Sequence, residues 1–207
     1  LGLIFASKKS KDYYLGNSSF KYSIIPSPIN IKSKKKKYQF QSKITIGTSC
    51  NISKVKGLEL FLMIAKKLQK FGNKKIYYEI HGNVFSSQKK YYEKLKYLIK
   101  LKNINNLSFK KKYDKAENIL KKFDIYISTS KSESSPTALW EAMGYGLPIL
   151  ATDVGDIKNI FKDYNNILDS NNFEKSLLLI VNLLQKKNLR KKLGVFSRNY
   201  AKRNFNF

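Results

Sequence analysis

Residues 128–156 read STSKSESSPTALWEAMGYGLPILATDVGD, and this stretch decides the fold. The run 124–128, which ends where this stretch begins, has the composition of a buried strand and leads into a polar, serine-rich loop. A helix over 136–145 follows, then a glycine turn, a second buried strand over 148–152 and another glycine turn. A strand, a helix and a strand in this order predict a β-α-β unit with parallel strands.

The same alternation extends through the chain on both sides of this stretch. Helices of ten or more residues separate short strands that are rich in Ile, Tyr and Phe. The sequence therefore predicts an α/β fold, a Rossmann-like parallel sheet flanked by helices, with its ligand crevice beyond the carboxyl ends of the strands. The expected strands cover 44–48, 76–80, 107–109, 124–128 and 148–152, and the expected helices cover 57–71, 91–101, 116–123, 136–145 and two segments after 177.

Two carboxylates flank the start of the helix that follows the serine-rich loop. Glu133 lies in the loop, and Glu141 lies near the second helical turn. Ser134 or Ser135 can cap this helix, and Pro136 suits its first position. Free backbone N–H groups at a helix start suit a phosphate or sugar hydroxyls, and a carboxylate can accept hydrogen bonds from two neighbouring hydroxyls. On their own, the two glutamates are also what a solvated loop and an ordinary helix would carry.

The two glutamates belong to a longer phrase, and three further motifs precede it. Lys56-Gly57 opens an earlier helix after a strand, His81-Gly82 follows the next strand, and Ile24-Ile25-Pro26 lies near the start. In this combination the sequence resembles the carboxyl-terminal half of the retaining glycosyltransferases of family 4, also called group 1. That family has a GT-B-type architecture, in which two Rossmann-like domains enclose a nucleotide sugar. The residues of the phrase that match are Ser130, Glu133, Pro136, Glu141, Ala142, Met143, Gly146, Pro148 and Gly155.

The resemblance implies a role for each matching residue. Glu133 and Lys56 would be the catalytic residues, with Glu133 holding hydroxyls of the donor sugar and Lys56 neutralising the diphosphate as it leaves. Glu141 would hold the ribose hydroxyls, and Gly82 would lie near the nucleobase. The donor would be a UDP- or GDP-sugar, with no metal and no other cofactor. The helix start would face the sugar and the diphosphate through its backbone N–H groups, and it comprises Ser134, Ser135, Pro136 and Thr137.

Four positions depart from the family pattern, and one of them is a glycine that would fall near Lys110 or Lys111. Ser134 stands where the family has a glycine, and Asn159 stands where it has an acidic residue. The Arg expected before the phosphate-binding Lys falls at Cys50 or Asn51, so the second cation for the diphosphate is missing. His81 is not expected to be the family's catalytic His, because that residue belongs to the other domain. A buried or base-facing structural His is the expectation instead.

The chain is expected to have three segments. Residues 1–29 would be a remnant of the amino-terminal domain and its hinge, and residues 30–43 a basic linker. Residues 44–207 would form the nucleotide-sugar-binding Rossmann-like domain, truncated at its carboxyl-terminal end. The resemblance implies the donor-binding portion of an enzyme that transfers a sugar with retention to a saccharide or lipid-linked acceptor, in surface polysaccharide or glycolipid synthesis. This portion alone is expected to bind the donor weakly and to be inactive.

Composition and charge limit the alternatives. The 207 residues include 41 Lys and Arg against 14 Asp and Glu, a net charge of +27, but only three of the basic residues are Arg. Sequence-specific nucleic-acid readers depend on Arg, so we expect no specific nucleic-acid partner. The lysine excess suits a peripheral contact with an anionic membrane. A single Cys and a single His exclude an internal disulfide and a zinc site built from Cys or His. A cytoplasmic location, or the inner face of the membrane, fits best.

Three other functions remain compatible with the sequence. A different nucleotide-sugar enzyme, such as a non-hydrolysing epimerase, would need acid–base residues in the cleft, where only His81 is available. A non-catalytic nucleotide-sugar-binding module would fit if the gene has no amino-terminal domain. A basic nucleic-acid-binding protein would show tight binding to DNA or RNA with a steep salt dependence.

Overall fold

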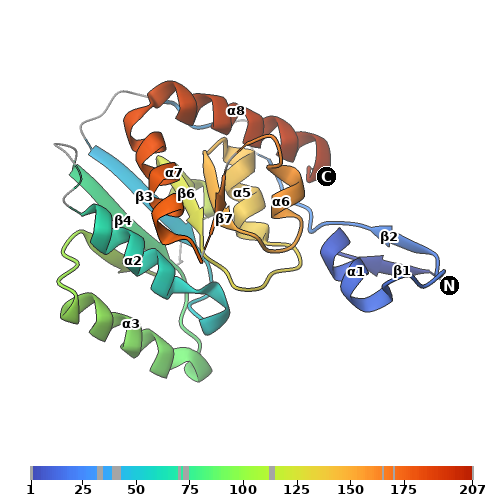
Figure 1. Cartoon of the computed structure of the whole chain (residues 1–207), viewed down its shortest axis with the longest axis horizontal. Coiled ribbons are helices and arrows are strands. Elements are labelled where there is room, and N and C mark those ends of the chain that lie inside the picture. Colours follow the sequence, from blue (N-terminus) through green and yellow to red (C-terminus); the bar gives the residue numbers. More distant parts are fainter. Residues whose placement is uncertain are drawn as a thin grey trace.

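A six-stranded sheet runs through the centre of the molecule, and its described pairings are all parallel (Figure 1). The structure, a computed structural model, describes residues 2–31, 35–38, 43–69, 71, 75–111, 115–164, 166–169 and 171–206. The strand order is β5-β4-β3-β6-β7-β8, so the predicted α/β fold with a parallel sheet is confirmed. The strands are β3 (Lys43–Ser49), β4 (Lys75–His81), β5 (Leu107–Lys110), β6 (Ile125–Ser128), β7 (Ile149–Thr152) and β8 (Ile167–Leu168).

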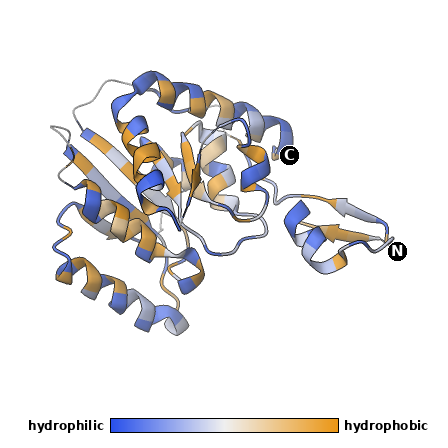
Figure 2. Ribbon diagram, in the orientation of Figure 1, coloured by the Kyte–Doolittle hydropathy of each residue, from blue (hydrophilic) through white to orange (hydrophobic). Residues whose placement is uncertain are grey.

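Helices cover both faces of this sheet, because side chains alternate along its strands. On β6, Ile125 and Ile127 join one cluster of buried apolar residues, and Tyr126 joins the other. Figure 2 shows the helices with apolar residues turned toward the sheet and polar residues turned outward. The first cluster takes in α2 (Leu58–Leu68), α3 (Lys89–Leu101) and α7 (Phe173–Gln185), and the second takes in α4 (Ala116–Leu120), α5 (Thr137–Tyr145) and α6 (Ile157–Ile160). α8 (Lys187–Asn204) contributes to both, with Leu193 in the first and Ala201 in the second.

Most elements lie where the sequence predicts them, with ends that differ by a few residues. Two short 3-10 helices, η1 (Lys54–Lys56) and η2 (Ser86–Gln88), precede α2 and α3. The expected helix over 57–71 ends at Leu68, and the one over 116–123 ends at Leu120. The sequence pattern does not predict α6 and β8, because elements of four and two residues are too short to show a hydrophobic period.

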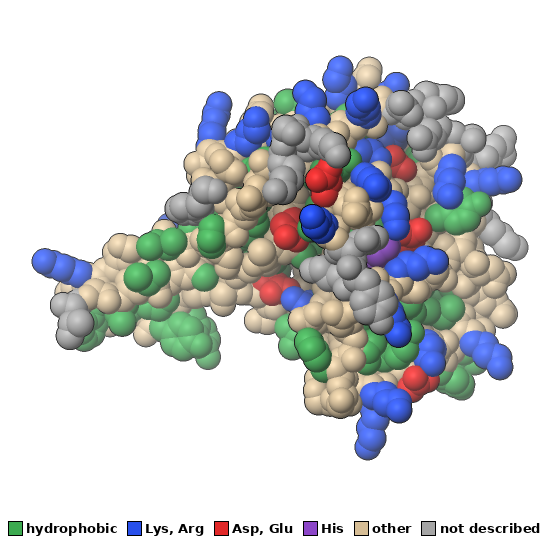
Figure 3. Space-filling model, turned by 180° about the vertical axis from the view of Figure 1, so that it is seen from behind, with side chains coloured by type: hydrophobic (Ala, Val, Ile, Leu, Met, Phe, Trp, Pro, Cys, Tyr) green, Lys and Arg blue, Asp and Glu red, His purple; other side chains and the backbone are tan. Residues whose placement is uncertain are grey.

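Residues 2–25 form a small β-α-β unit of their own, which we call the N-terminal unit. β1 (Leu3–Phe5) pairs in parallel with β2 (Tyr22–Ile24), and α1 (Lys8–Leu15) joins them. Apolar pieces are predicted here but no helix, because α1 is mostly polar and buries no residue. The unit projects from the main body (Figure 1) and carries apolar side chains on its surface (Figure 3). The exposed apolar residues are Leu3, Ile4, Tyr13, Tyr14, Phe20, Tyr22, Ile24 and Ile25.

The basic segment after the N-terminal unit is not simply a solvated linker. Lys36 forms an ion pair with Asp124 at 2.9 Å, and only 10% of the lysine side chain is exposed. The expectation of a free basic linker over 30–43 does not hold at this lysine, because Asp124, directly before β6, supplies a largely shielded partner. Residues 32–34 and 39–42 of the expected linker lie outside the described residues.

Tyr78, in the middle of β4, gives a testable link between burial and alkaline stability. Its side chain is fully buried, its hydroxyl has no hydrogen-bond partner among the described residues, and burial raises its pKa. An acid whose pKa is raised on folding stabilises the folded state below its unfolded pKa of about 10, and that stability is lost as the pH rises further. Tyr78→Phe removes the unpaired hydroxyl and should raise the free energy of unfolding at pH 7 by about 1 kcal/mol. Above pH ~10 the wild type should lose about 1.4 kcal/mol of its free energy of unfolding per pH unit through Tyr78, and the variant should not show this loss.

Urea unfolding at pH 7 and at alkaline pH measures both effects. Tyr97→Phe is the matched control, because 64% of Tyr97 is exposed and the substitution removes the same hydroxyl from the surface of the protein. An equal fall in stability with pH for the wild type and Tyr78→Phe would show that Tyr78 does not contribute to alkaline unfolding.

Candidate functional site

A polar cavity of about 260 Å³ lies at the carboxyl ends of β3 and β6, against the start of α5. β3 and β6 are neighbours in the sheet, so the loops that follow them meet at one edge although they are far apart in sequence. The lining residues are Thr48, Ser49, Cys50, Asn51, Lys56, Tyr126, Ser128, Thr129, Ser130, Glu133, Ser135, Pro136, Thr137, Ala138 and Leu139.

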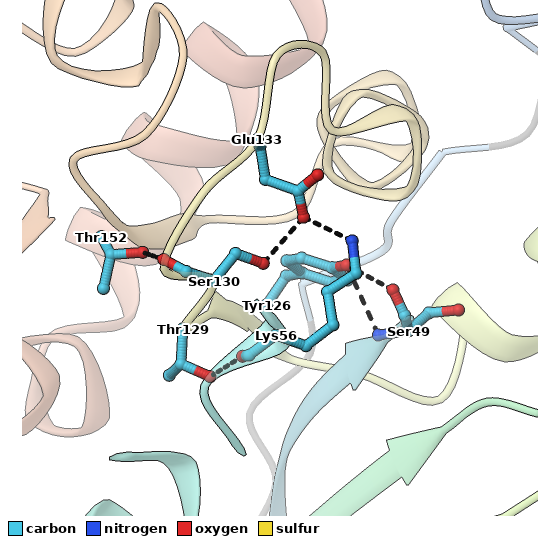
Figure 4. A network of polar contacts seen from close by, with 7 residues as sticks. All are labelled: Ser49, Lys56, Tyr126, Thr129, Ser130, Glu133 and Thr152. Atoms are coloured by element: carbon cyan, nitrogen blue, oxygen red, sulfur yellow. Dashed lines mark hydrogen bonds and ion pairs between the residues drawn. The ribbon is translucent and has the colours of Figure 1, made fainter. Parts of the chain in front are cut away.

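Lys56 and Glu133 form an ion pair in this cavity (Figure 4). The ammonium of Lys56 contacts Oε1 of Glu133, and the Ser130 hydroxyl donates a hydrogen bond to the same oxygen at 2.8 Å. Only 24% of the lysine side chain and 15% of the glutamate side chain are exposed. Charges this shielded from water interact more strongly than surface charges, so a ligand that separates them must offer each a new partner. The two predicted catalytic residues are thus brought together.

The backbone around Lys56 is held against the loop after β6. The Thr129 hydroxyl donates to the carbonyl oxygen of Lys56 at 3.0 Å, and the Lys131 amide donates to the carbonyl oxygen of Val55 at 2.7 Å. Gly57 has a φ of +56°, and a Cβ atom there would lie 2.2 Å from the carbonyl oxygen of Thr129. The Lys-Gly motif is thus explained locally, because only glycine permits this turn and this close approach.

The loop that carries Glu133 is held on its other side by the last residue of β7 and by the chain that follows it. The Thr152 hydroxyl donates to the carbonyl oxygen of Ser130. Gly155 has a φ of +54°, and a Cβ atom there would lie 2.9 Å from the carbonyl oxygen of Ser134 and 3.2 Å from that of Glu133. The second glycine of the family phrase therefore permits close contact with the backbone of residues 133–134.

The start of α5 differs from the serine-capped start that the sequence predicts. α5 begins at Thr137, and Pro136 occupies the N-cap position, where it has no side-chain capping bond. Ser135 does not cap the helix, because its hydroxyl oxygen accepts hydrogen bonds from the Trp140 indole N–H and the Ser27 amide, both at 2.9 Å. Ser135, Pro136 and Thr137 line the cavity, and the first-turn amides of α5 have no acceptor within the helix.

The described residues around the cavity do not include three of the predicted binding residues. Ser134 packs against Gly155, as described above. Glu141 is half-buried on α5 and adds a small effect to the pKa of Tyr126, which is raised chiefly by burial. Gly82 lies where β3 and β4 end, and a Cβ atom there would lie 1.8 Å from the carbonyl oxygen of Cys50. This close packing accounts for the glycine without reference to a nucleobase.

Tyr126 is a cavity residue that the sequence pattern does not single out. Its hydroxyl donates to the carbonyl oxygen of Ser49 at 3.1 Å and ties β6 to the end of β3 (Figure 4). Its place in a strand predicts only a core aromatic residue, and no sequence signal distinguishes it.

Cys50 and Asn51 occupy the positions where the family's Arg is expected, and both line the cavity. Of the two expected settings for His81, buried or base-facing, the structure shows burial, because His81 is 3% exposed and its Nε2 lies 2.7 Å from Oε2 of Glu79.

Comparison with known families agrees with this geometry. The sequence model of the family described as glycosyl transferases group 1 matches residues 30–200. The chain belongs to the group 1 glycosyl transferases. The match covers the sheet, the cavity and α5, and it begins after the N-terminal unit.

Two curated relatives are similar to this group 1 chain. An uncharacterised glycosyltransferase of Methanocaldococcus jannaschii is 32% identical over 184 residues, which are 85% of this chain and 45% of the relative. The O-antigen biosynthesis glycosyltransferase WclY of Escherichia coli is 25% identical over 196 residues, which are 90% of this chain and 52% of the relative. The chain therefore spans about half the length of the curated relatives that it matches.

Solved structures show the same fold. A TarM mutant of S. aureus, in complex with fondaparinux, alpha-GlcNAc-glycerol and UDP, superposes with a TM-score of 0.82 at 20% identity, over 99% of this chain and 41% of TarM. Anabaena HepE in complex with UDP and glucose superposes with a TM-score of 0.81 at 16% identity, over 99% of this chain and 59% of HepE. The predicted Rossmann-like half of a GT-B glycosyltransferase is thereby confirmed as a fold.

Proposed function

We propose that this chain is the donor-binding part of a retaining glycosyltransferase of the family 4 type. In the whole enzyme it would transfer a sugar from a nucleotide-diphosphate sugar to an acceptor. The observation that carries the proposal is the ion pair of Lys56 and Glu133 at the start of α5. It provides a cation for a diphosphate, a carboxylate for sugar hydroxyls, and first-turn helix amides for further anionic oxygens.

Each group has a physical task in this proposal. When the bond to the sugar breaks, the diphosphate gains negative charge, and a fixed cation stabilises that charge most in the transition state. Lys56 is the cation, and no metal is needed for this task. Glu133 then turns from Lys56 to the sugar hydroxyls. Glu141 on α5 takes the ribose hydroxyls, and the nucleobase lies near Gly82 at the end of β4.

The size of the cavity and the N-terminal unit support a second domain as partner. A volume of about 260 Å³ is below the range of roughly 300–1,000 Å³ for complete small-molecule sites. The N-terminal unit has a parallel sheet of only two strands, whereas parallel sheets are normally covered on both faces. Residues 1–29 are accordingly proposed as part of an acceptor-binding amino-terminal domain. The chain alone should bind a donor weakly and transfer nothing.

The acceptor in this proposal is a saccharide or a lipid-linked saccharide of a surface polysaccharide or glycolipid. The O-antigen role in the printed name of WclY supports that class of acceptor. α8 contains seven basic residues and no acidic residue, which suits a peripheral contact with anionic lipid at the inner face of a membrane. Among the described residues, no helix combines the length and the apolar character needed to cross a bilayer. Equal sedimentation with anionic and neutral vesicles would refute the membrane contact.

Calorimetric titration tests the proposed function. The wild-type chain is titrated with UDP-, GDP- and ADP-glucose, and with a DNA duplex at low and high salt. We expect one nucleotide sugar to bind saturably. Its affinity should fall only slightly with salt, as far as salt screens the charge of the diphosphate. If no nucleotide sugar binds while DNA binds with a steep salt dependence, the chain is a basic nucleic-acid-binding protein instead.

A further inference from the structure

The short segment that follows β7 connects the N-terminal unit to the main body. Oδ2 of Asp156 accepts a hydrogen bond from the Lys8 amide at 2.9 Å, and Oδ1 accepts one from the Lys9 amide at 3.3 Å. The ammonium of Lys9 donates to the carbonyl oxygen of Asp153 at 3.3 Å. A single segment, residues 153–156, thus holds the amino-terminal end of α1.

The contact completes the cap of α1, which its own residues leave unfinished. The amides of the first helical turn have no acceptor within a helix, and Ser7 satisfies only the amide of Ser10, at 3.1 Å. The Asp156 carboxylate accepts hydrogen bonds from the amides of Lys8 and Lys9, which precede Ser10. A carboxylate at this end of a helix also meets the positive end of the helix dipole. Both backbone hydrogen bonds that α1 donates to residues 153–156 therefore end on this one side chain, and the Lys9 ammonium adds a further contact at Asp153.

The other side of the same segment lies on residues 133–135, which we call the donor loop because the proposed function places the donor there. A Cβ atom on Gly155 would lie 2.9 Å from the carbonyl oxygen of Ser134 and 3.2 Å from that of Glu133, so the two backbones are in close contact. A second connection comes from the hinge, where the Ser27 amide donates to the Ser135 hydroxyl at 2.9 Å. The donor loop is thus held between the hinge and the segment that docks α1.

We propose that Asp156 is a positioning residue, which fixes the donor loop by docking the N-terminal unit. Asp156 is not among the residues that line the cavity, so it acts through Gly155 and the backbone of Glu133. With α1 docked, the loop has one arrangement; when α1 leaves, the loop loses a support on the side of Glu133. The inference rests on the proposed function only for the statement that this loop faces a donor.

The single tryptophan of the chain reports on the donor loop. Trp140 donates its indole N–H to the Ser135 hydroxyl at 2.9 Å, and 2% of it is exposed. In the full chain, Asp156→Ala should shift the Trp140 emission to longer wavelength and raise its quenching by acrylamide. Hydrogen exchange at Lys8 and Lys9 should become faster in the same variant. Asp156→Asn, which keeps one acceptor oxygen, should give intermediate values in both measurements.

Two control variants separate positioning from simple loss of helix stability. Ser7→Ala removes the local cap and should speed exchange at Ser10 without changing Trp140, because the bonds to Asp156 remain. Asp163→Ala removes an exposed carboxylate seven residues further along and should change neither measurement. If Asp156→Ala speeds exchange in α1 but leaves Trp140 unchanged, or if it changes neither, Asp156 does not position the loop.

Ligand binding gives a readout that separates this inference from the proposed function. Asp156→Ala should weaken binding of the nucleotide sugar more than binding of the free nucleoside diphosphate, because the disturbed loop carries Glu133. Equal weakening of both ligands would contradict a role in positioning Glu133. If neither ligand binds the wild type, the proposed function fails, while the fluorescence and exchange results still decide whether Asp156 fixes the loop.

Discussion

Replacing Lys56 by methionine should weaken binding of a nucleoside diphosphate by about a hundredfold, or ~2.7 kcal/mol. Methionine keeps an unbranched stem but removes the ammonium that pairs with Glu133. The loss has two sources: the diphosphate loses its cation, and it meets a carboxylate whose charge is no longer balanced. Calorimetric titration of the full chain with UDP or GDP, whichever binds the wild type, measures the effect.

Two further variants identify the source of that loss. Lys54→Met removes an exposed charge from the same 3-10 helix and should change the affinity less than twofold, since exposed charges are strongly screened. The double variant Lys56→Met with Glu133→Gln should recover part of the affinity, because it removes the unbalanced carboxylate. Unchanged affinity in Lys56→Met would show that the diphosphate does not lie on Lys56.

Replacing Gly82 by alanine should lower the free energy of unfolding by about 3–5 kcal/mol. The new Cβ atom would lie 1.8 Å from the carbonyl oxygen of Cys50, which is backbone and not the end of a flexible side chain. That backbone has little freedom to move, because the Cys50 amide donates to the carbonyl oxygen of His81 and the Ile52 amide donates to that of Asn83, both at 2.9 Å. The ends of β3 and β4 would have to separate.

Urea unfolding followed by circular dichroism measures this loss. Gly2→Ala is the matched control, because the contact nearest to its new Cβ atom is an ordinary one of 3.5 Å, and its effect should stay within about 0.5 kcal/mol. A Gly82→Ala variant as stable as the wild type would show that the ends of β3 and β4 can relax. The close packing would then not explain the glycine.

The parts of the fold that the sequence predicts correctly are those with a local signal. Alternating strands and helices predict a parallel sheet, and the serine-rich loop followed by α5 is visible in residues 128–156. Lys56 and Glu133 each follow a strand, and the carboxyl ends of parallel strands share one edge of a sheet. Their ion pair depends on the tertiary structure, because it requires β3 and β6 to be neighbours in the sheet, and no sequence pattern predicts that strand order.

The parts that escape prediction depend on partners far away in sequence. Ser135 looks like a helix cap, but the distant Ser27 amide and the nearby Trp140 take its hydroxyl instead. α1 has a weak helical pattern and is completed by Asp156, 148 residues away from Lys8. The sequence predicts a solvated side chain for Lys36, yet it pairs with Asp124 and only 10% of it is exposed. In each case a tertiary contact overrides the preference of the local sequence.

The most direct test of the central claim compares a nucleotide sugar with its free nucleoside diphosphate on three proteins: the wild type, Glu133→Gln and Glu141→Ala. If Glu133 faces the sugar and Glu141 the ribose, Glu133→Gln removes the affinity that the sugar adds and leaves the diphosphate bound at least as tightly, because Lys56 is released. Glu141→Ala weakens both ligands by the same factor. If Glu133→Gln weakens both ligands equally, or changes neither, Glu133 does not contact the sugar and the assignment of the donor site is wrong.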